Sequence, residues 1–314
     1  MDVEQPVVFR TLRSARTELD NPVVTIGNFD GVHLGHQEIF RRTRRHADAL
    51  DTAAIALTFH PHPVRHFRPE IDEFRISTDR QKFELMIEHG LDAVVALPFD
   101  DALASLEPAD FVDEIIAEGL DASFVVVGAN FRFGRKRAGS TDDLERLAGE
   151  RAIDTEICSE VERDGEVVSS TRIRELLQQG SIGEATTLLT RPHRVQGTVV
   201  HGDERGRTLG YPTANIEPEN LLPADGIYAT WLRVEGGERL PAASSIGFRP
   251  TFDGEERRLE SFVLDRDDLD LYGADVELEF IEYVRPEVSF ESADELVDQM
   301  DADVEDVRQI LDVN

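Results

Sequence analysis

The fold of this chain can be predicted from one part of its sequence, which reads Val23-Val24-Thr25-Ile26-Gly27-Asn28-Phe29-Asp30-Gly31-Val32-His33-Leu34-Gly35-His36. Its first four residues form an apolar run that predicts a buried strand, and the glycines that follow predict a turn. After His36, apolar side chains recur at helical spacing, with four arginines on the other side. A strand, a glycine-rich turn and a helix in this order are typical of phosphate sites in α/β proteins. Turn amides and the helix N-terminus face the anion there.

Two histidines open the predicted helix. His33 and His36 are three residues apart, so one helix face presents both to the same phosphate. Gly35 keeps side-chain bulk away from that phosphate. A His-x-x-His pair also suits zinc, and His60 with His62 would add ligands to it. However, the metalloprotease motif His-Glu-x-x-His is missing, and the glycine-rich setting favours phosphate.

From residue 23 to about residue 190, predicted strands and helices alternate along the chain. We expect strands at 23–26, 53–59, 93–97, 124–127 and 155–157, and helices at 37–50, 78–89, 108–119 and 141–151. Continuous apolar runs suit a parallel sheet covered on both faces. The pattern therefore predicts an α/β fold with a doubly wound, Rossmann-like domain.

The pattern changes after two short helical segments at 171–179 and 182–189. Strands are expected at 197–200, 227–234, 242–246, 259–264 and 276–281, separated by glycine and proline turns. Such spacing predicts an antiparallel β-barrel. Residues 293–311 show the apolar stripe of an amphipathic terminal helix. We expect two domains, 1–190 and 191–314, with the boundary near 188–193.

The charge excludes some partners. The net charge is −31, from 33 basic and 64 acidic residues. Residues 191–314 carry −17 of it and the first 190 carry −14, so an acidic tail is excluded. A uniformly acidic surface argues against nucleic acid and anionic membrane as partners. Salt would screen the self-repulsion, which suggests a cytoplasm of high salt content.

Two further features suit the cytoplasm. The sequence has no stretch of about 18 apolar residues, so no membrane-spanning helix is expected. The first residues lack the pattern of a signal peptide. Cys158 is the only cysteine, so an intramolecular disulfide is impossible. The strand pattern that precedes it favours a buried, inert thiol.

Three more motifs follow strands or open a helix in the first domain. They are Phe59-His60-Pro61-His62-Pro63, the run 128–134 from Gly128 to Gly134 with Asn130 inside it, and Ser169-Ser170-Thr171-Arg172-Ile173-Arg174. His60 and His62 beside prolines favour a role in shaping a loop. Asp30 suits a turn as well as a site. Arg132, Arg135 and Arg137 suit either solvent or a contact to ATP or pyrophosphate.

The second domain holds another glycine-rich loop. It runs from Gly202 through Gly206 and Gly210 to Pro212-Thr213-Ala214-Asn215. The Gly-Lys-Ser/Thr of a Walker A loop is missing, and a plain barrel hairpin is the alternative. Glu260 lies in an apolar strand pattern, where it is either a functional acid or an exposed-face glutamate.

In this order, the motifs resemble the bacterial bifunctional riboflavin kinase/FAD synthetase (FMN adenylyltransferase) family over almost the whole chain. The resemblance implies adenylyl transfer in the first domain, with His33, His36 and Arg174 as catalytic groups. It also implies that ATP or its phosphates contact a set of first-domain residues: Gly27, Asn28, Gly35, Asn130, Ser169, Ser170 and Thr171.

For the second domain the resemblance implies a kinase. Glu260 occupies the position of the catalytic glutamate, which takes the proton of the ribityl hydroxyl. The ATP phosphates are expected at Gly202, Gly206, Gly210, Thr213 and Asn215, with Mg²⁺ at Thr213 and with Asn215 as a second candidate ligand. The family usually has histidine where Phe262 stands and an aromatic residue where Arg266 stands.

We therefore predict a two-domain cytoplasmic enzyme with riboflavin, FMN and ATP as substrates and Mg²⁺ as cofactor. It phosphorylates riboflavin to FMN and adenylylates FMN to FAD, releasing pyrophosphate. One alternative is a monofunctional enzyme whose other domain only binds flavin or regulates. Another is a non-catalytic flavin carrier. The sequence leaves the oligomeric state open.

Overall fold

The chain folds into two units, each with its own sheet. The computed structural model describes residues 6–71, 73–202, 211–234, 237–251, 254–266 and 268–313. The first unit comprises Met1–Asp72 and Asp79–Ser169, and the second comprises Glu73–Thr78 and Ser170–Asn314. Gly206 and Gly210, predicted to contact phosphate, lie outside the described residues.

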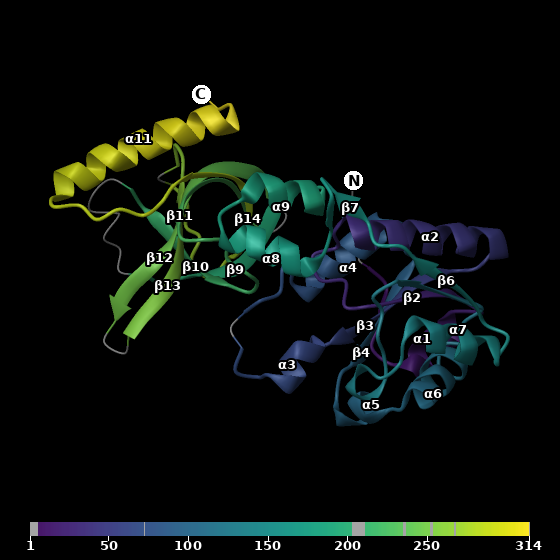
Figure 1. Cartoon of the computed structure of the whole chain (residues 1–314). Helices are drawn as coiled ribbons and strands as arrows, with labels where there is room; N and C mark the ends of the chain where they lie inside the picture. Colours follow the sequence, from purple (N-terminus) through teal and green to yellow (C-terminus); the bar gives the residue numbers. More distant parts are fainter. Residues whose placement is uncertain are drawn as a thin grey trace. The chain divides into compact units, whose positions relative to one another are not determined.

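The first unit is an α/β domain around a parallel sheet (Figure 1). Its order is β1 (Val8–Phe9), α1 (Leu12–Glu18), β2 (Val23–Ile26), α2 (Leu34–Leu50), β3 (Ala54–His60), α3 (Pro63–Phe67), α4 (Asp79–Glu88), β4 (Ala93–Pro98), α5 (Asp101–Ser105), α6 (Pro108–Asp110), the π-helix η1 (Phe111–Ala117), β5 (Phe124–Gly128), the 3₁₀-helix η2 (Arg135–Arg137), α7 (Thr141–Gly149), β6 (Asp154–Cys158), β7 (Glu162–Arg163) and β8 (Glu166–Val167).

Six of these strands form the sheet in the order β1-β4-β3-β2-β5-β6, and every pairing in it is parallel. Its two faces bury separate cores, one beneath α1, η1 and α7 and the other beneath α2 and α4. The prediction of a doubly wound fold is thus confirmed. The strand order reverses between β2 and β5, and ligands bind at the carboxyl ends of strands at such a point.

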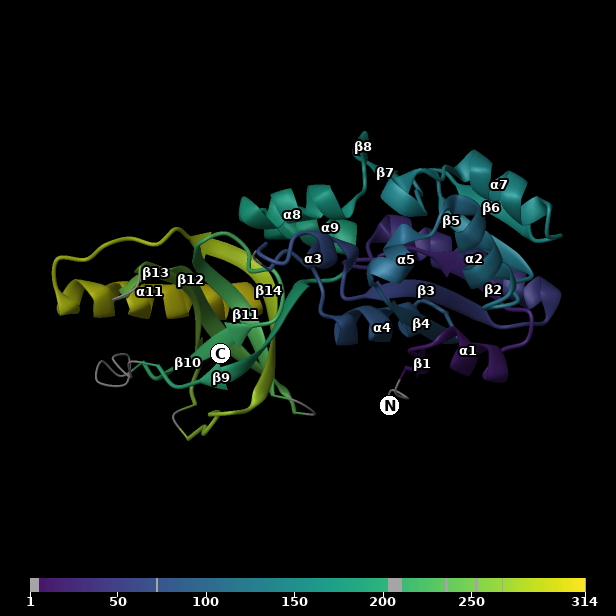
Figure 2. The same cartoon turned by 90° about the horizontal axis from the view of Figure 1, so that it is seen from below.

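The second unit contains a closed antiparallel barrel in the order β10-β13-β12-β11-β14-β9 (Figure 2). Its elements are α8 (Ser170–Gln178), α9 (Ile182–Leu189), β9 (His193–Val200), β10 (Thr213–Pro218), β11 (Gly226–Val234), β12 (Arg239–Thr251), β13 (Gly254–Val263), β14 (Asp275–Arg285) and α11 (Ala293–Leu311). The terminal helix packs on β11, β12 and β14 through Val304, Val307 and Leu311. The predicted barrel and terminal helix are both confirmed.

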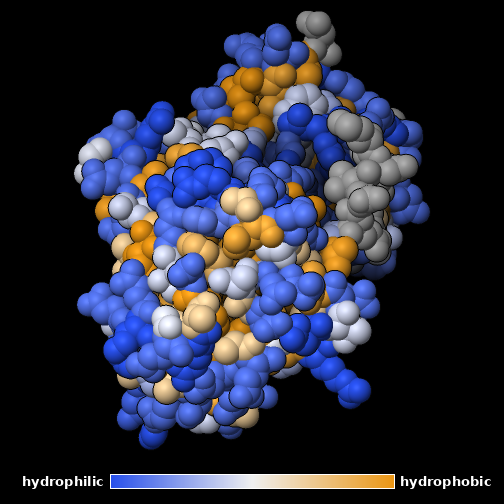
Figure 3. All heavy atoms as spheres, turned by 90° about the vertical axis from the view of Figure 1, so that its right-hand side faces the viewer, coloured by the Kyte–Doolittle hydropathy of each residue, from blue (hydrophilic) through white to orange (hydrophobic). Residues whose placement is uncertain are grey.

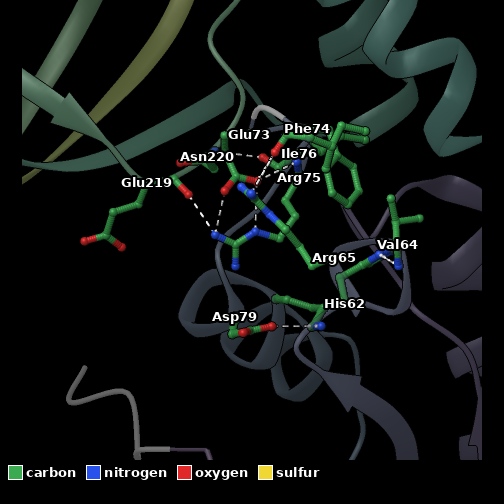
Figure 4. A network of polar contacts seen from close by, with 12 residues as sticks. His62, Val64, Arg65, Glu73, Phe74, Arg75, Ile76, Asp79, Glu219 and Asn220 are labelled. Atoms are coloured by element: carbon green, nitrogen blue, oxygen red, sulfur yellow. Dashed lines mark hydrogen bonds and ion pairs between the residues drawn. The ribbon is translucent and has the colours of Figure 1, made fainter. Parts of the chain in front are cut away.

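A short segment of the N-terminal half belongs to the second unit. Residues 73–78 separate α3 from α4, yet they bond to the loop after β10. The Arg75 guanidinium donates to the carbonyl of Glu219 at 2.9 Å, and the Asn220 amide donates to the carbonyl of Ile76 at 2.9 Å (Figure 4). Asn220 is fully buried, and its side-chain oxygen also accepts from the Gln196 amide at 2.9 Å. These bonds satisfy groups that burial would otherwise leave unpaired.

The surface bears the acidic excess of the sequence. Figure 3 shows one face, on which hydrophilic residues dominate and apolar ones gather only in small groups. Some carboxylates are paired: Arg42 bridges Glu38 at 2.7 Å and Glu156 at 2.5 Å, and Arg308 binds Asp265 at 2.6 Å. With 64 acidic against 33 basic residues, the carboxylates cannot all be neutralised one to one by basic side chains.

We expect this protein to gain stability as salt is added. Both halves of the chain are strongly negative, and the Debye length falls from ~10 Å at 0.1 M salt to ~3 Å at 1 M. Urea unfolding midpoints measured from low to molar KCl check this. A midpoint that stays constant or falls would contradict a stabilising role of salt.

Candidate active sites

The turn between β2 and α2 is built from unusual backbone conformations. Phe29 and Val32 have positive φ angles of 52° and 40°, which are uncommon for side chains with a Cβ. A Cβ on Gly27 would come within 2.9 Å of the Phe29 ring, so this ring leaves room only for glycine. Strained turns of this kind are concentrated at functional sites.

His33 and His36 lie together at the start of α2. Their rings stack with centroids 3.6 Å apart and 21° between the planes, and His36 also meets the edge of Phe29 at 5.3 Å. His33 is only 5% exposed. A Cβ on Gly35 would come within 3.2 Å of the His33 ring. The prediction that both histidines reach one place from the helix N-terminus therefore agrees with their geometry.

Polar groups of neighbouring strands surround this turn. The Thr58 hydroxyl, buried in β3, donates to the carbonyl of Asn28 at 3.4 Å. Beyond β5, the Asn130 side-chain oxygen lies 3.5 Å from where a Gly128 Cβ would stand. Asn28 and Asn130 thus follow the two strands between which the sheet order reverses. This edge offers amides and histidine N–H groups to an anion.

An aromatic cluster lies at the carboxyl ends of β3 and β4. Phe59, His66, Phe67 and Phe99 are in ring contact, with centroid distances of 5.4 Å for His66–Phe99, 5.6 Å for Phe59–Phe99 and 5.8 Å for Phe67–Phe99. Phe67 is 66% exposed. An exposed aromatic cluster is a surface on which a flat ring stacks.

Other first-unit motif residues have local partners. The Nδ1 atom of His62 accepts from the Val64 amide at 3.2 Å and caps α3, while His60 bonds to Asp79. Arg135 pairs with Glu107 at 3.0 Å on the surface. These contacts give His62 a shaping role in its loop, as the prolines beside it suggested.

The motif 169–174 divides between the two units. Ser169 ends the first unit, and Ser170, Thr171 and Arg174 belong to the second, on α8. The Arg174 Nε donates to the carbonyl of Phe74 at 2.8 Å, and its guanidinium lies 5.4 Å from the centre of the Phe74 ring. Its predicted role toward ATP phosphates stays a prediction.

The barrel brings Thr213 and Glu260 together. Asn215 on β10 lies opposite Glu260 on β13, and the Thr213 hydroxyl donates to the Glu260 carboxylate at 3.2 Å. Leu259 and Ser261, the neighbours of Glu260, are buried inside the barrel. Because successive strand residues face opposite sides, Glu260, Thr213 and Asn215 share the outer face.

Gly202 faces the same group. A Cβ on Gly202 would collide with the side-chain amide of Asn215, so only glycine allows this approach. Four of the residues predicted for the kinase site, Gly202, Thr213, Asn215 and Glu260, therefore meet at one edge of the barrel.

The described residues bear on the predicted thiol, on the zinc alternative and on a membrane span. Cys158 is buried, as predicted, and burial raises the pKa of its thiol to about 11, which disfavours the reactive thiolate. Within the described ranges, histidine, cysteine and carboxylate side chains form no cluster of three or more that is arranged for a metal. In the same ranges no helix has the length and apolarity needed to cross a membrane.

Comparisons with known proteins identify the family. A family model described as FAD synthetase matches residues 15–172, and one described as Riboflavin kinase matches residues 189–311. A protein of Haemophilus influenzae called bifunctional riboflavin kinase/FMN adenylyltransferase is 34% identical over 95% of this chain and 97% of its own. One of the same name from Pseudomonas fluorescens is 37% identical over 96% of both chains. This chain belongs to that bifunctional family.

A solved structure covers both units of this family member. A crystal structure from Streptococcus pneumoniae, titled a macrolide-efflux protein, has a TM-score of 0.83 and 30% identity over 97% of this chain and 99% of that one. Its title names a different activity, but the fold is shared along the whole chain. The predicted family is thus confirmed by sequence, and the fold by structure.

The two departures from the family pattern have defined surroundings. Phe262 packs in the apolar layer beneath α11 and meets the Tyr211 ring at 5.0 Å. Arg266 binds Asp268 through two hydrogen bonds of 2.6 and 3.1 Å on the surface. The hydrogen bond between Thr213 and Glu260 forms with phenylalanine at position 262.

Proposed function

We propose that this protein makes FAD from riboflavin in two ATP-consuming steps, with FMN as the intermediate. The observation that carries the proposal is the presence of two separate candidate sites in one family member. One is the His33–His36 turn of the α/β unit, and the other is the Thr213–Glu260 edge of the barrel. We assign residues 1–190 to adenylyl transfer and residues 191–314 to the kinase.

In the kinase step, Glu260 acts as general base. Its carboxylate accepts the proton of the terminal ribityl hydroxyl as that oxygen attacks the γ-phosphorus of ATP, and ADP leaves. The Thr213 hydroxyl, 3.2 Å away, orients the carboxylate before substrate binds. The close approach of Gly202 to Asn215 keeps this edge open to phosphate.

The residues at this edge fit Mg²⁺ that arrives with ATP. The hydroxyl of Thr213, the amide oxygen of Asn215 and the carboxylate of Glu260 are hard oxygen donors on one face. Mg²⁺ is held by few protein ligands together with substrate phosphates, and bound there it neutralises phosphate charge. We propose Thr213 as its first protein ligand, with Asn215 beside it.

In the adenylyl step the attacker needs no base. An FMN phosphate oxygen attacks the α-phosphorus of ATP, and pyrophosphate leaves. A phosphate monoester is already largely a dianion at neutral pH, since its second pKa is about 6. His33, His36 and the amides at the start of α2 stabilise the phosphoryl charge that develops. Arg174 is proposed to assist at the β- and γ-phosphates.

We place the flavin ring of FMN on the aromatic cluster of Phe59, His66, Phe67 and Phe99. The cluster follows β3 and β4, and the histidine turn follows β2, so both lie at the carboxyl edge of one parallel sheet. A ring stacked on Phe67 has its ribityl phosphate chain free to extend along this edge.

Replacing Phe67 with alanine is expected to raise the KM for FMN about tenfold, because stacking on an aromatic side chain contributes about 1–3 kcal/mol. Phe67 is 66% exposed, so stability should change little. Steady-state FAD formation from FMN and ATP measures the effect. Phe67→Tyr keeps the ring and serves as the control. An unchanged KM in Phe67→Ala would place the flavin elsewhere.

We propose the cytoplasm as the location, because both steps consume ATP and a buried free thiol suits a reducing compartment. The overall function is tested by incubating the pure protein with riboflavin, Mg²⁺ and ATP in high salt and separating the flavins by chromatography. FMN followed by FAD supports the proposal. Only one of the two conversions would indicate a monofunctional enzyme, and flavin binding without ATP turnover would indicate a carrier.

A further inference from the structure

Tyr211 links the barrel edge to the terminal helix. It stands two residues before Thr213, and its phenol donates a hydrogen bond to the carboxylate of Asp301 on α11. The Tyr211 ring also meets the Phe262 ring edge-on, with centroids 5.0 Å apart and 62° between the planes. Tyr211 is therefore held at both its hydroxyl and its ring.

The donor in this bond stays a donor at physiological pH. Partial burial, together with the negative charge of Asp301, raises the pKa of the Tyr211 phenol to about 12. The phenol therefore remains neutral and keeps its proton for the carboxylate. A hydrogen bond to a charged acceptor is among the stronger ones in proteins.

The helix that carries Asp301 is firmly attached to the barrel. Arg285 on β14 binds Asp303 through two hydrogen bonds of 2.7 and 2.6 Å, and Arg308 binds Asp265 through two of 2.7 and 2.6 Å. Between these ion pairs Val307 is fully buried. Asp301 is thus a fixed point relative to β13 and β14.

Tyr211 and its ring partner Phe262 are each two residues away from a member of the hydrogen-bonded pair Thr213 and Glu260. Thr213, two residues on, lies opposite Phe262 in the β10–β13 pairing, and Phe262 is two residues from Glu260 on the same face of β13. A shift of Tyr211 would move both the strand that carries Thr213 and the ring beside Glu260. The Thr213–Glu260 contact, at 3.2 Å, depends on that register.

We propose that Tyr211, hydrogen-bonded to Asp301, is a positioning residue for riboflavin phosphorylation and that α11 is part of the kinase site's support. In this role Tyr211 touches neither the substrate nor the reacting atoms. It fixes Thr213 and Glu260 relative to each other, so its loss should act mainly on kcat. This inference rests on the proposed kinase function of the barrel.

The test compares Tyr211→Phe, Asp301→Ala, Asp301→Asn and the double variant Tyr211→Phe/Asp301→Ala in the full chain. We expect Tyr211→Phe and Asp301→Ala each to lower kcat for FMN formation about tenfold, as expected for loss of a hydrogen bond to a charged group. The KM for riboflavin should stay within about twofold, because binding contacts remain. Asp301→Asn still accepts from the phenol and should restore most of the rate.

Further outcomes separate positioning from folding. The double variant should be no slower than the worse single variant, because both remove one bond. Conversion of FMN to FAD by the same samples should not change, and Asp306→Ala, an exposed site on the same helix, should not change FMN formation. Unchanged kcat in Tyr211→Phe, additive losses, or equal loss of both activities would each overturn the inference. If the unaltered protein makes no FMN, the proposed function fails instead.

Discussion

Replacing Glu260 with glutamine is expected to lower kcat for riboflavin phosphorylation by about 10²-fold to 10⁴-fold, the usual contribution of a general base. Glutamine keeps the size and the ability to accept a hydrogen bond from Thr213, which in the native protein is 3.2 Å from the carboxylate. It cannot take a proton from the ribityl hydroxyl. The loss should therefore appear in kcat, with the KM for riboflavin nearly unchanged.

The second activity of the protein supplies the control for this variant. Conversion of FMN to FAD should remain at the native rate, because the histidine turn of the proposed adenylyl site belongs to the other unit. Glu282→Gln removes one charge from an exposed position on β14 and should leave both steps unchanged. Separate assays that start from riboflavin and from FMN distinguish the steps. Full kinase activity in Glu260→Gln would rule out Glu260 as the base.

Much of the fold followed from apolar periodicity. The predicted strand at 23–26 and helix at 293–311 coincide with β2 and α11, because a buried strand and an amphipathic helix leave clear patterns. β10 was missed: Thr213-Ala214-Asn215 reads as a polar loop, and barrel closure rather than apolar character makes it a strand. β1 is two residues long and is formed only by pairing with β4.

Tertiary contacts determine two features of the fold that the apolar periodicity of the sequence does not predict. The expected helix at 108–119 instead consists of α6 and a π-helix, η1, which buries Phe111, Val112, Ile115 and Ile116. The segment 73–78 has no sequence signal for joining the second unit; its place depends on bonds such as Asn220 to Ile76. The assignment of function to 1–190 and 191–314 stays a prediction.

The candidate sites were predictable to different degrees. Thr213 and Glu260 lie 47 positions apart, and only the motif resemblance suggested that they meet. His33 and His36 were predictable from spacing alone, since one helical turn brings them together. The aromatic cluster was missed, because Phe67 and Phe99 follow different strands and neither stands in a distinctive motif. Tyr211 could be noticed in its loop, but its partner on α11 could not.

The double replacement His33→Ala/His36→Ala is expected to lower kcat for FAD formation from FMN by about 10²-fold to 10³-fold or more, the usual effect of removing a donor that faces developing charge. The two rings stack at 3.6 Å, so they act on one place, and the first replacement should account for most of the loss. The sum of the losses in the two single variants, expressed as free energies, should therefore exceed the loss in the double variant.

Stability must be separated from catalysis in this variant, because His33 is only 5% exposed and its removal leaves a void. His33→Asn and His36→Asn keep a side-chain N–H donor with less loss of volume, and should retain more activity than alanine at similar melting temperature. His89 is a partly exposed histidine of the same unit outside the motif, and His89→Ala should leave FAD formation intact.

FMN formation by the barrel should stay at the native level in every one of these proteins. If the double alanine variant folds and still adenylylates FMN at the native rate, the phosphate-binding role of the turn between β2 and α2 is wrong. If it instead loses FMN formation as well, the two steps do not occupy separate sites.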